Sequence, residues 1–146
     1  GIQSGDNTQK KENLVSIFEN PKVSIDTKVG VLLISYIQMN SGDSAKRKEA
    51  LELAAILRRV HPDDAKAYAI SGDLYYMDKQ DDAALEQYKK ALELNKDKDV
   101  LQVWQQVLLI YNQKGDWNNL LKTANDAVEL FPNSAVIYLF KGIFQY

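Results

Sequence analysis

A chain of 146 residues with 45% apolar and 26% charged side chains has the composition of a folded protein, and its length suits one core or three to four helical hairpins. The formal net charge of −2 argues against nucleic-acid and anionic-lipid binding, and no apolar run reaches the roughly 18 residues of a membrane span. Without cysteine, disulfides, thiolate nucleophiles and thiolate zinc sites are excluded.

The N-terminal part is polar. Residues 1–12 lack a starting methionine and predict a disordered leader, with Gly1 as a tag remnant. Residues 13–23 predict a short helix and a linker, because Pro21 disfavours a helical residue before it. Removal of an export signal is compatible with this start, so the compartment stays open between the cytoplasm and the periplasm or cell envelope.

The first predicted hairpin is irregular. Ser24 is an expected N-cap for a helix of about fourteen residues that ends near Met39, and residues 40–43 form a turn. A second helix follows over 44–60 and ends at His61-Pro62.

The clearest unit is Ala65–Leu94, which predicts two amphipathic helices joined by a short polar turn. Bulky and small residues share one face of each helix at spacings of four and three. They are Tyr68, Gly72 and Tyr75 in the first helix and Ala84, Tyr88 and Ala91 in the second. Small residues at these positions let two helices approach closely, with the tyrosines filling the gaps beside them.

The pattern recurs on both sides. Ala50 precedes Ala84 by 34 residues, and a third unit after Asp99 carries Ala127 at the place of Ala91. A fourth unit opens at Asn133-Ser134, and the sequence ends at Tyr146 after one helix. We therefore expect a fragment of a longer array, with an apolar last helix that offers a self-association surface of Tyr138, Phe140, Ile143 and Phe144.

This joint spacing resembles the tetratricopeptide repeat over residues 26–146, with departures at Ser71, where the family favours a large aliphatic residue, and Lys96, where it favours proline. The resemblance implies an all-α fold of antiparallel helical hairpins, stacked as a right-handed α-solenoid over 24–146. Its units are 26–64, 65–98, 99–134 and a truncated 135–146. The chain also looks like repeat domains of bacterial cell-envelope proteins.

Residues for catalysis or cofactor binding are sparse. The only histidine, His61, stands at a helix end, where a solvent-facing position is expected. The acidic pairs at turns are expected to cap helices, and no phosphate-binding glycine motif or calcium loop occurs. We expect no enzyme activity, cofactor or metal.

In the resembled family, the first helices of successive units line a concave peptide groove. Carried over by position, the groove candidates here are Tyr36, Met39, Lys66, Asp73, Tyr76, Met77, Gln102, Gln105, Leu109 and Asn112, extended by Leu32, Gln113, Val136, Leu139 and Ile143. The lysine, asparagine and arginine set with which some members hold chaperone tails is absent, so that ligand is not expected.

Three functions remain open. The leading prediction is a non-enzymatic interaction module or scaffold that binds a peptide or protein in the groove, as part of a larger protein. One alternative is a structural spacer or self-association arm that uses the last helix. Another is a recruitment domain of an enzyme whose catalytic domain lies outside this sequence.

Overall fold

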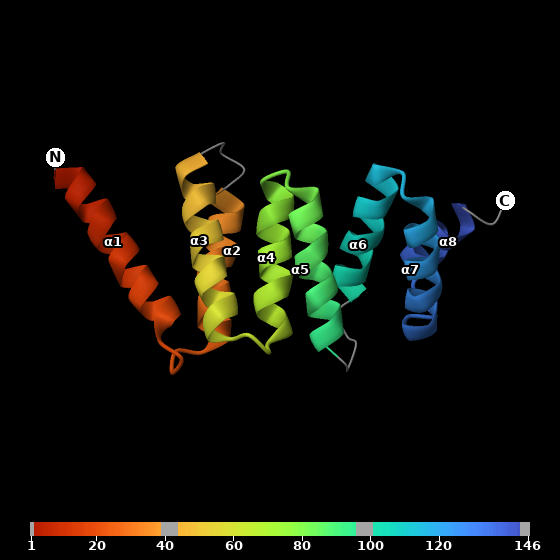
Figure 1. The fold of residues 1–146 in the computed structure, drawn as a ribbon, viewed down its shortest axis with the longest axis horizontal. Helices are drawn as coiled ribbons and strands as arrows, with labels where there is room; N and C mark the ends of the chain where they lie inside the picture. The colour runs from red at the N-terminus through yellow and green to blue at the C-terminus, as the bar shows by residue number, and fades with distance from the viewer. Residues whose placement is uncertain (1, 39–43, 96–100, 144–146) are drawn as a thin grey trace.

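Helices make up the structure, a computed structural model that describes residues 2–38, 44–95 and 101–143. Within those ranges every regular element is an α-helix (Figure 1). The elements are α1 (Ile2–Glu19), α2 (Ile25–Gln38), α3 (Ser44–Val60), α4 (Ala65–Met77), α5 (Asp81–Leu94), α6 (Leu101–Lys114), α7 (Trp117–Leu130) and α8 (Ala135–Ile143). The turn predicted at 40–43 and residues 96–99 of the next connection lie outside the described residues.

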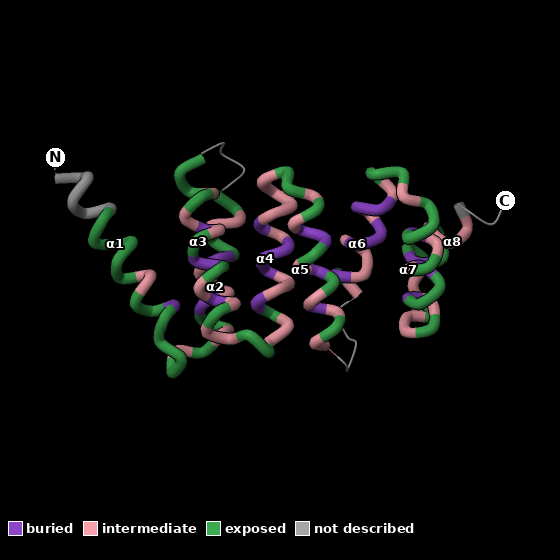
Figure 2. The backbone as a smooth tube through the Cα atoms, viewed as in Figure 1, coloured by how far each residue is buried: buried purple, intermediate pink, exposed green. Residues whose placement is uncertain are grey.

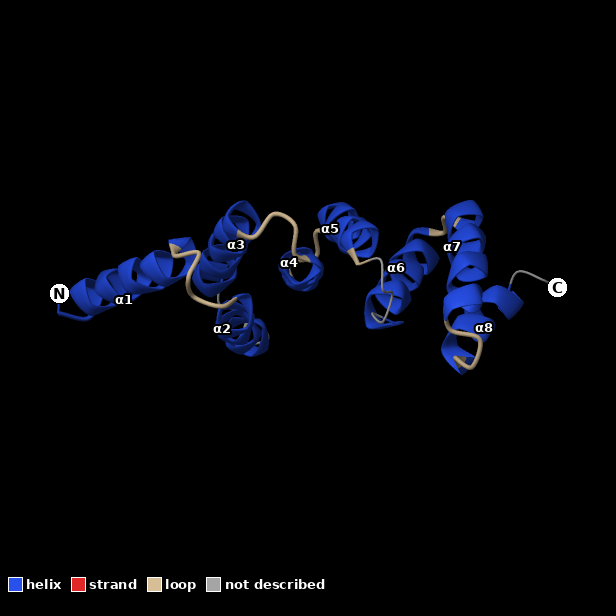
Figure 3. Ribbon diagram, turned by 90° about the horizontal axis from the view of Figure 1, so that it is seen from below, coloured by secondary structure: helices blue, strands red, loops and turns tan. Residues whose placement is uncertain are grey.

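The helices form an elongated array of antiparallel hairpins with α1 and α8 at opposite ends (Figure 1). Neighbours along the chain pack together from α2 to α8, and α2 also packs beside α4. In Figure 3, α3 and α5 lie on one side and α2 and α4 on the other. Since α2 packs beside α4 and α6 beside α8, we assign α2, α4, α6 and α8 to one layer and α3, α5 and α7 to the other. The predicted α-solenoid of stacked hairpins is therefore confirmed.

The N-terminal segment differs from the prediction of a disordered leader over residues 1–12. Helix α1 begins at Ile2 and packs against α3. Its C-terminal part is anchored by Phe18, which is fully buried, and Lys11 forms an ion pair with Glu52 of α3 at 3.0 Å. An anchored helix extends at low cost, because each further residue adds a backbone hydrogen bond without a new nucleation step. The sequence pattern of residues 1–12 could not predict this helix, because its support comes from contacts with α3.

Side-chain oxygens cap several helix starts, as the sequence predicted for acidic and hydroxyl residues. In each case the oxygen accepts a hydrogen bond from a backbone N–H two or three residues later, which satisfies a donor that the helix leaves unpaired. These caps are Ser24, Asp64, Asp116 and Ser134.

The hydrophobic core runs along the array between the two layers. Buried positions gather where the helices face one another (Figure 2). One cluster spans α1 to α4 around Phe18, Leu32 and Leu57, and a second spans α5 to α8 around Tyr88 and Ile137. Leu32 is thus a core residue and not part of a groove, which corrects its predicted position.

Gly72 makes room for an aromatic ring. A Cβ atom at Gly72 would lie 2.5 Å from two ring carbons of Tyr88, which is fully buried. The small residue is required because the Tyr88 ring crosses the α4 backbone at this point. The sequence pattern predicted a close approach of the two helices at Gly72, with tyrosines beside the contact. In the structure the Tyr88 ring itself lies against Gly72.

Ser71 is a polar residue at a position where the resembled family favours an aliphatic one. Its buried hydroxyl donates to the carbonyl of Ala67 at 2.7 Å and accepts from an Arg58 Nη atom of α3 at 2.6 Å. The Arg58 guanidinium also lies 5.9 Å from the centroid of the Tyr75 ring. Since both polar groups are paired, this departure does not weaken the contact between α3 and α4.

Candidate peptide-binding face

The groove candidates that the structure describes fall on the four helices of one layer. Tyr36 lies on α2, Lys66 to Met77 on α4, Gln102 to Gln113 on α6, and Val136, Leu139 and Ile143 on α8. We call the side of the first three helices that lies opposite α3, α5 and α7 the α2–α4–α6 face. Met39 lies outside the described residues. The assignment of these candidates to a ligand site stays a prediction.

Asp73 is the polar centre of this face. Its Oδ1 accepts a hydrogen bond from the hydroxyl of Tyr88 on α5 at 2.5 Å. Burial raises the pKa of the Asp73 carboxyl, and the hydrogen bond from Tyr88 opposes that rise only in part. A half-buried carboxylate with one hydroxyl donor is a strong acceptor that remains incompletely satisfied.

Two tyrosines, Tyr36 and Tyr88, interact with this carboxylate. Burial raises the pKa of the Tyr36 hydroxyl, and the charges of Asp73 and Tyr76 raise it further. Burial also raises the pKa of Tyr88, followed by the effect of the Asp73 charge, while a hydrogen bond with Gln106 acts in the opposite direction. Tyr36 of α2 and Tyr88 of α5 thus both interact with the Asp73 carboxylate of α4, and Gln106 of α6 interacts with Tyr88.

The same face is linked across its hairpins by an amide. Gln113 of α6 donates from Nε2 to the hydroxyl oxygen of Tyr76 on α4 at 3.1 Å. Asn112, Gln105 and Leu109 are half-buried nearby on the same helix, and Gln102 is exposed. Half-buried amides and rings of this kind can form hydrogen bonds and apolar contacts with a peptide.

Two predicted lining residues have partners within the chain. The ammonium group of Lys66 is 2.8 Å from Asp26 of α2, and this hydrogen bond raises its pKa. Met77 is half-buried and packs against the N-terminal core cluster. Neither contact was visible in the sequence, because each joins residues of different helices.

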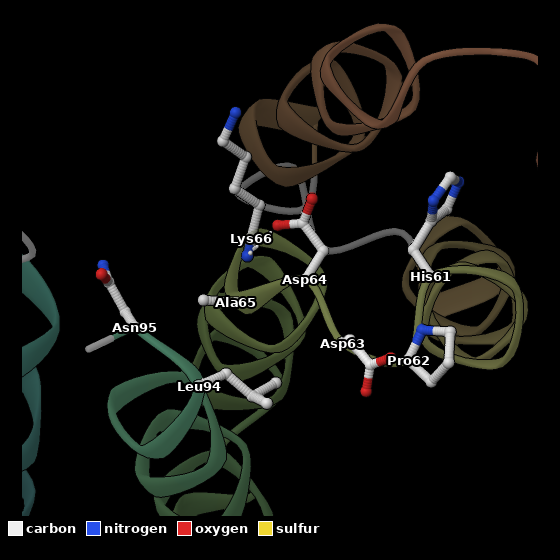
Figure 4. Close-up of a pocket in the computed structure, with 8 residues that line it drawn as sticks. All are labelled: His61, Pro62, Asp63, Asp64, Ala65, Lys66, Leu94 and Asn95. Atoms are coloured by element: carbon white, nitrogen blue, oxygen red, sulfur yellow. Dashed lines mark hydrogen bonds between the residues drawn. The ribbon is translucent and has the colours of Figure 1, made fainter. Parts of the chain in front are cut away.

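A cavity lies at the α3–α4 connection and the end of α5, and among the groove candidates it is lined by Lys66 (Figure 4). It measures about 590 Å³ and is polar, and the Asp64 carboxylate within it caps α4. Its lining residues are His61, Pro62, Asp63, Asp64, Ala65, Lys66, Leu94 and Asn95. Sequence analysis did not predict this cavity.

His61 is held by a buried lysine, which corrects its predicted solvent-facing role. Lys28 of α2 is fully buried, and its Nζ lies 2.8 Å from His61 Nε2 and 2.8 Å from the backbone oxygen of Asn20. Since an ammonium group can only donate, the histidine accepts through Nε2 and is neutral. Burial lowers the pKa of Lys28, and burial followed by the Lys28 charge lowers the pKa of His61.

The ranges that the structure describes contain no group of three or more side chains able to hold a metal ion. None of the helices in those ranges combines the length and apolarity needed to cross a membrane.

The comparisons with known proteins identify the fold. No family model matches the sequence, and no curated protein matches it. The chain is similar to one in the structure of Naa15/Naa10 bound to HypK-THB, with a TM-score of 0.57 and 18% identity over 91% of this chain. The chain spans 23% of the length of that one. Together with the stacked hairpins, this likeness shows that the chain has the all-helical fold of an α-solenoid.

Proposed function

We propose that the chain is a non-enzymatic interaction module that binds a peptide or protein partner across the α2–α4–α6 face. The observation that carries the proposal is the network of Tyr36, Asp73 and Tyr76 with amides of α6 on a single face. Helices α3, α5 and α7 lie behind this face, while its side chains stay partly exposed. The similar chain comes from a structure of a complex, which adds support. The tetratricopeptide assignment of the units and a bacterial cell-envelope origin are proposals from the sequence pattern alone.

Affinity capture from a native extract tests this function. We expect Tyr76→Ala with Asn112→Ala to lose the captured partner, because both side chains lie on the proposed contact surface. The matched control is Trp117→Ala with Asn125→Ala, which removes an exposed ring and an exposed amide from α7 in the other layer.

Folding must be checked in the same samples, because Tyr76 packs against the core and its loss lowers stability. Circular dichroism at the capture temperature serves this purpose. Equal capture by wild type and the folded Tyr76/Asn112 variant would rule out the α2–α4–α6 face as the binding surface.

A self-association arm is the second candidate function, favoured by the apolar surface of α8. Val136, Tyr138 and Leu139 are 43%, 46% and 65% exposed. Phe140 is half-buried, and Phe144 of the predicted surface lies outside the described residues. Sedimentation equilibrium distinguishes the two functions, since Leu139→Glu should convert an oligomer of this kind into a monomer. A wild-type monomer would exclude this second function.

A further inference from the structure

Asp73 is the only acidic side chain on the described part of α2, α4 and α6 that lacks a cationic partner. Five charged residues lie on these helices within the described ranges: Asp26, Lys28, Lys66, Asp73 and Lys114. Lys66 pairs with Asp26, Lys114 with Asp82 of α5, and Lys28 is enclosed between Asn20 and His61. Among the described residues, no cationic side chain pairs with Asp73.

The hydrogen bond from Tyr88 does not require the negative charge of Asp73. It occupies Oδ1, and a neutral amide oxygen in the same place would also accept it. Partial burial makes the ionised form of Asp73 costly, which is the reason that its pKa is raised. An external cation at this carboxylate would offset that cost.

The neighbouring rings suit the same ligand. Aromatic faces attract ammonium and guanidinium groups, and the chain uses this contact twice internally, with Arg58 at Tyr75 and Lys89 at Tyr111. Tyr36 interacts with the charge of Asp73 and with Tyr76, which follows Asp73 by three residues on α4, and neither ring has such an internal cation among the described residues.

We infer that the α2–α4–α6 face recognises a lysine or arginine side chain of its peptide partner, with Asp73 as the anion and the rings of Tyr36 and Tyr76 beside it. This inference rests on the proposed peptide-binding function and names the chemistry of the ligand. The cation binds the ionised carboxylate, so affinity should fall as the pH drops through the pKa of Asp73, which lies above its usual value.

Selection from a phage-displayed library of random 12-residue peptides against the immobilised full chain tests the inference. We expect the enriched peptides to share a lysine or arginine. Replacing that residue by glutamine should weaken binding by about tenfold, and Asp73→Asn should cause a similar loss. The two losses should not add, because they remove the same interaction.

The control for charge alone is Asp126→Asn, which removes an exposed carboxylate from α7 in the other layer. An equal loss in both aspartate variants would contradict recognition by Asp73. A second test variant, Tyr36→Leu, leaves the hydrogen bond between Asp73 and Tyr88 in place and should weaken binding of cationic peptides more than that of their glutamine versions.

The outcomes separate this inference from the function on which it rests. Enriched peptides without a cation that are lost by the Tyr76→Ala/Asn112→Ala variant would overturn the inference and leave the peptide-binding function standing. Peptides that this variant binds as well as wild type, or no enrichment at all, would contradict both.

Discussion

Two buried polar pairs in this molecule have different surroundings. Lys28 is fully buried, and two acceptors of the same chain, on Asn20 and His61, accept hydrogen bonds from its ammonium group. Asp73 is only half-buried and receives a hydrogen bond from Tyr88 of α5. A buried charged group therefore does not by itself indicate a ligand-binding site. A fully buried pair such as Lys28 and His61 stabilises the packing of its helices. A partly exposed pair such as Asp73 and Tyr88 can in addition bind a ligand.

The largest expected effect comes from disturbing the packing of Tyr88, which donates a hydrogen bond to Asp73. Gly72→Ala drives a methyl group into the Tyr88 ring, whose hydroxyl reaches Asp73. We expect a loss of about 1–3 kcal/mol in the free energy of unfolding, measured with urea.

The matched control is Gly30→Ala in α2, where the added Cβ has no contact within 4 Å beyond its chain neighbours and the backbone of its own helix. That substitution should raise the free energy of unfolding by about 0.5–1 kcal/mol, because alanine favours helix over glycine. Equal effects of the two substitutions would show that the Tyr88 ring does not limit residue 72.

The contact between Lys28 and His61 should make the free energy of unfolding depend on pH. His61 has a pKa below its usual 6.5 in the fold, so the unfolded chain binds more protons. The contribution of neutral His61 to stability is therefore fully present above pH 6.5, and it is lost as the pH falls from there towards the lower folded-state pKa of His61. Asp64 opposes this change, but burial and Lys28 outweigh it.

Urea unfolding between about pH 7.5 and pH 5.5 measures the effect, and His61→Gln provides the control. Glutamine keeps an acceptor for Lys28 but does not titrate, and the chain has no other histidine. A pH dependence of the same size in His61→Gln would assign it to other groups.

The smallest expected effect on stability belongs to Asp73→Asn. The raised pKa of Asp73 means that the fold disfavours the ionised form, so its stability falls as the pH rises through that pKa. Asparagine keeps an acceptor for Tyr88 without the charge, so the free energy of unfolding at neutral pH should stay unchanged or rise. A loss of about 2 kcal/mol, typical of a charged hydrogen bond, would make Asp73 structural and remove the contrast with Lys28.

The sequence predicted the hairpins because helix periodicity and caps are local. The positions of Gly72 and Ser24 follow from residues three or four places away, and both roles are present in the structure. The polar pairs could not be predicted in this way. Lys28 and His61 are 33 residues apart, and their contact depends on how α2 packs beside the end of α3.

The candidate face was predicted only at the level of its helices. Position in the repeat placed Asp73 and Tyr76 on one layer, but the hydrogen bond from Tyr88 depends on a ring orientation across the α4–α5 hairpin. The extension of α1 to Ile2 was missed for the related reason that its support comes from α3.

Backbone amide chemical-shift mapping of the isotope-labelled chain with a selected peptide tests most directly whether the α2–α4–α6 face is the binding surface. We expect shifts concentrated at Tyr36, Asp73, Tyr76 and Asn112, with α7 unaffected. Shifts confined to α3, α5 and α7 or to α8 would contradict this expectation.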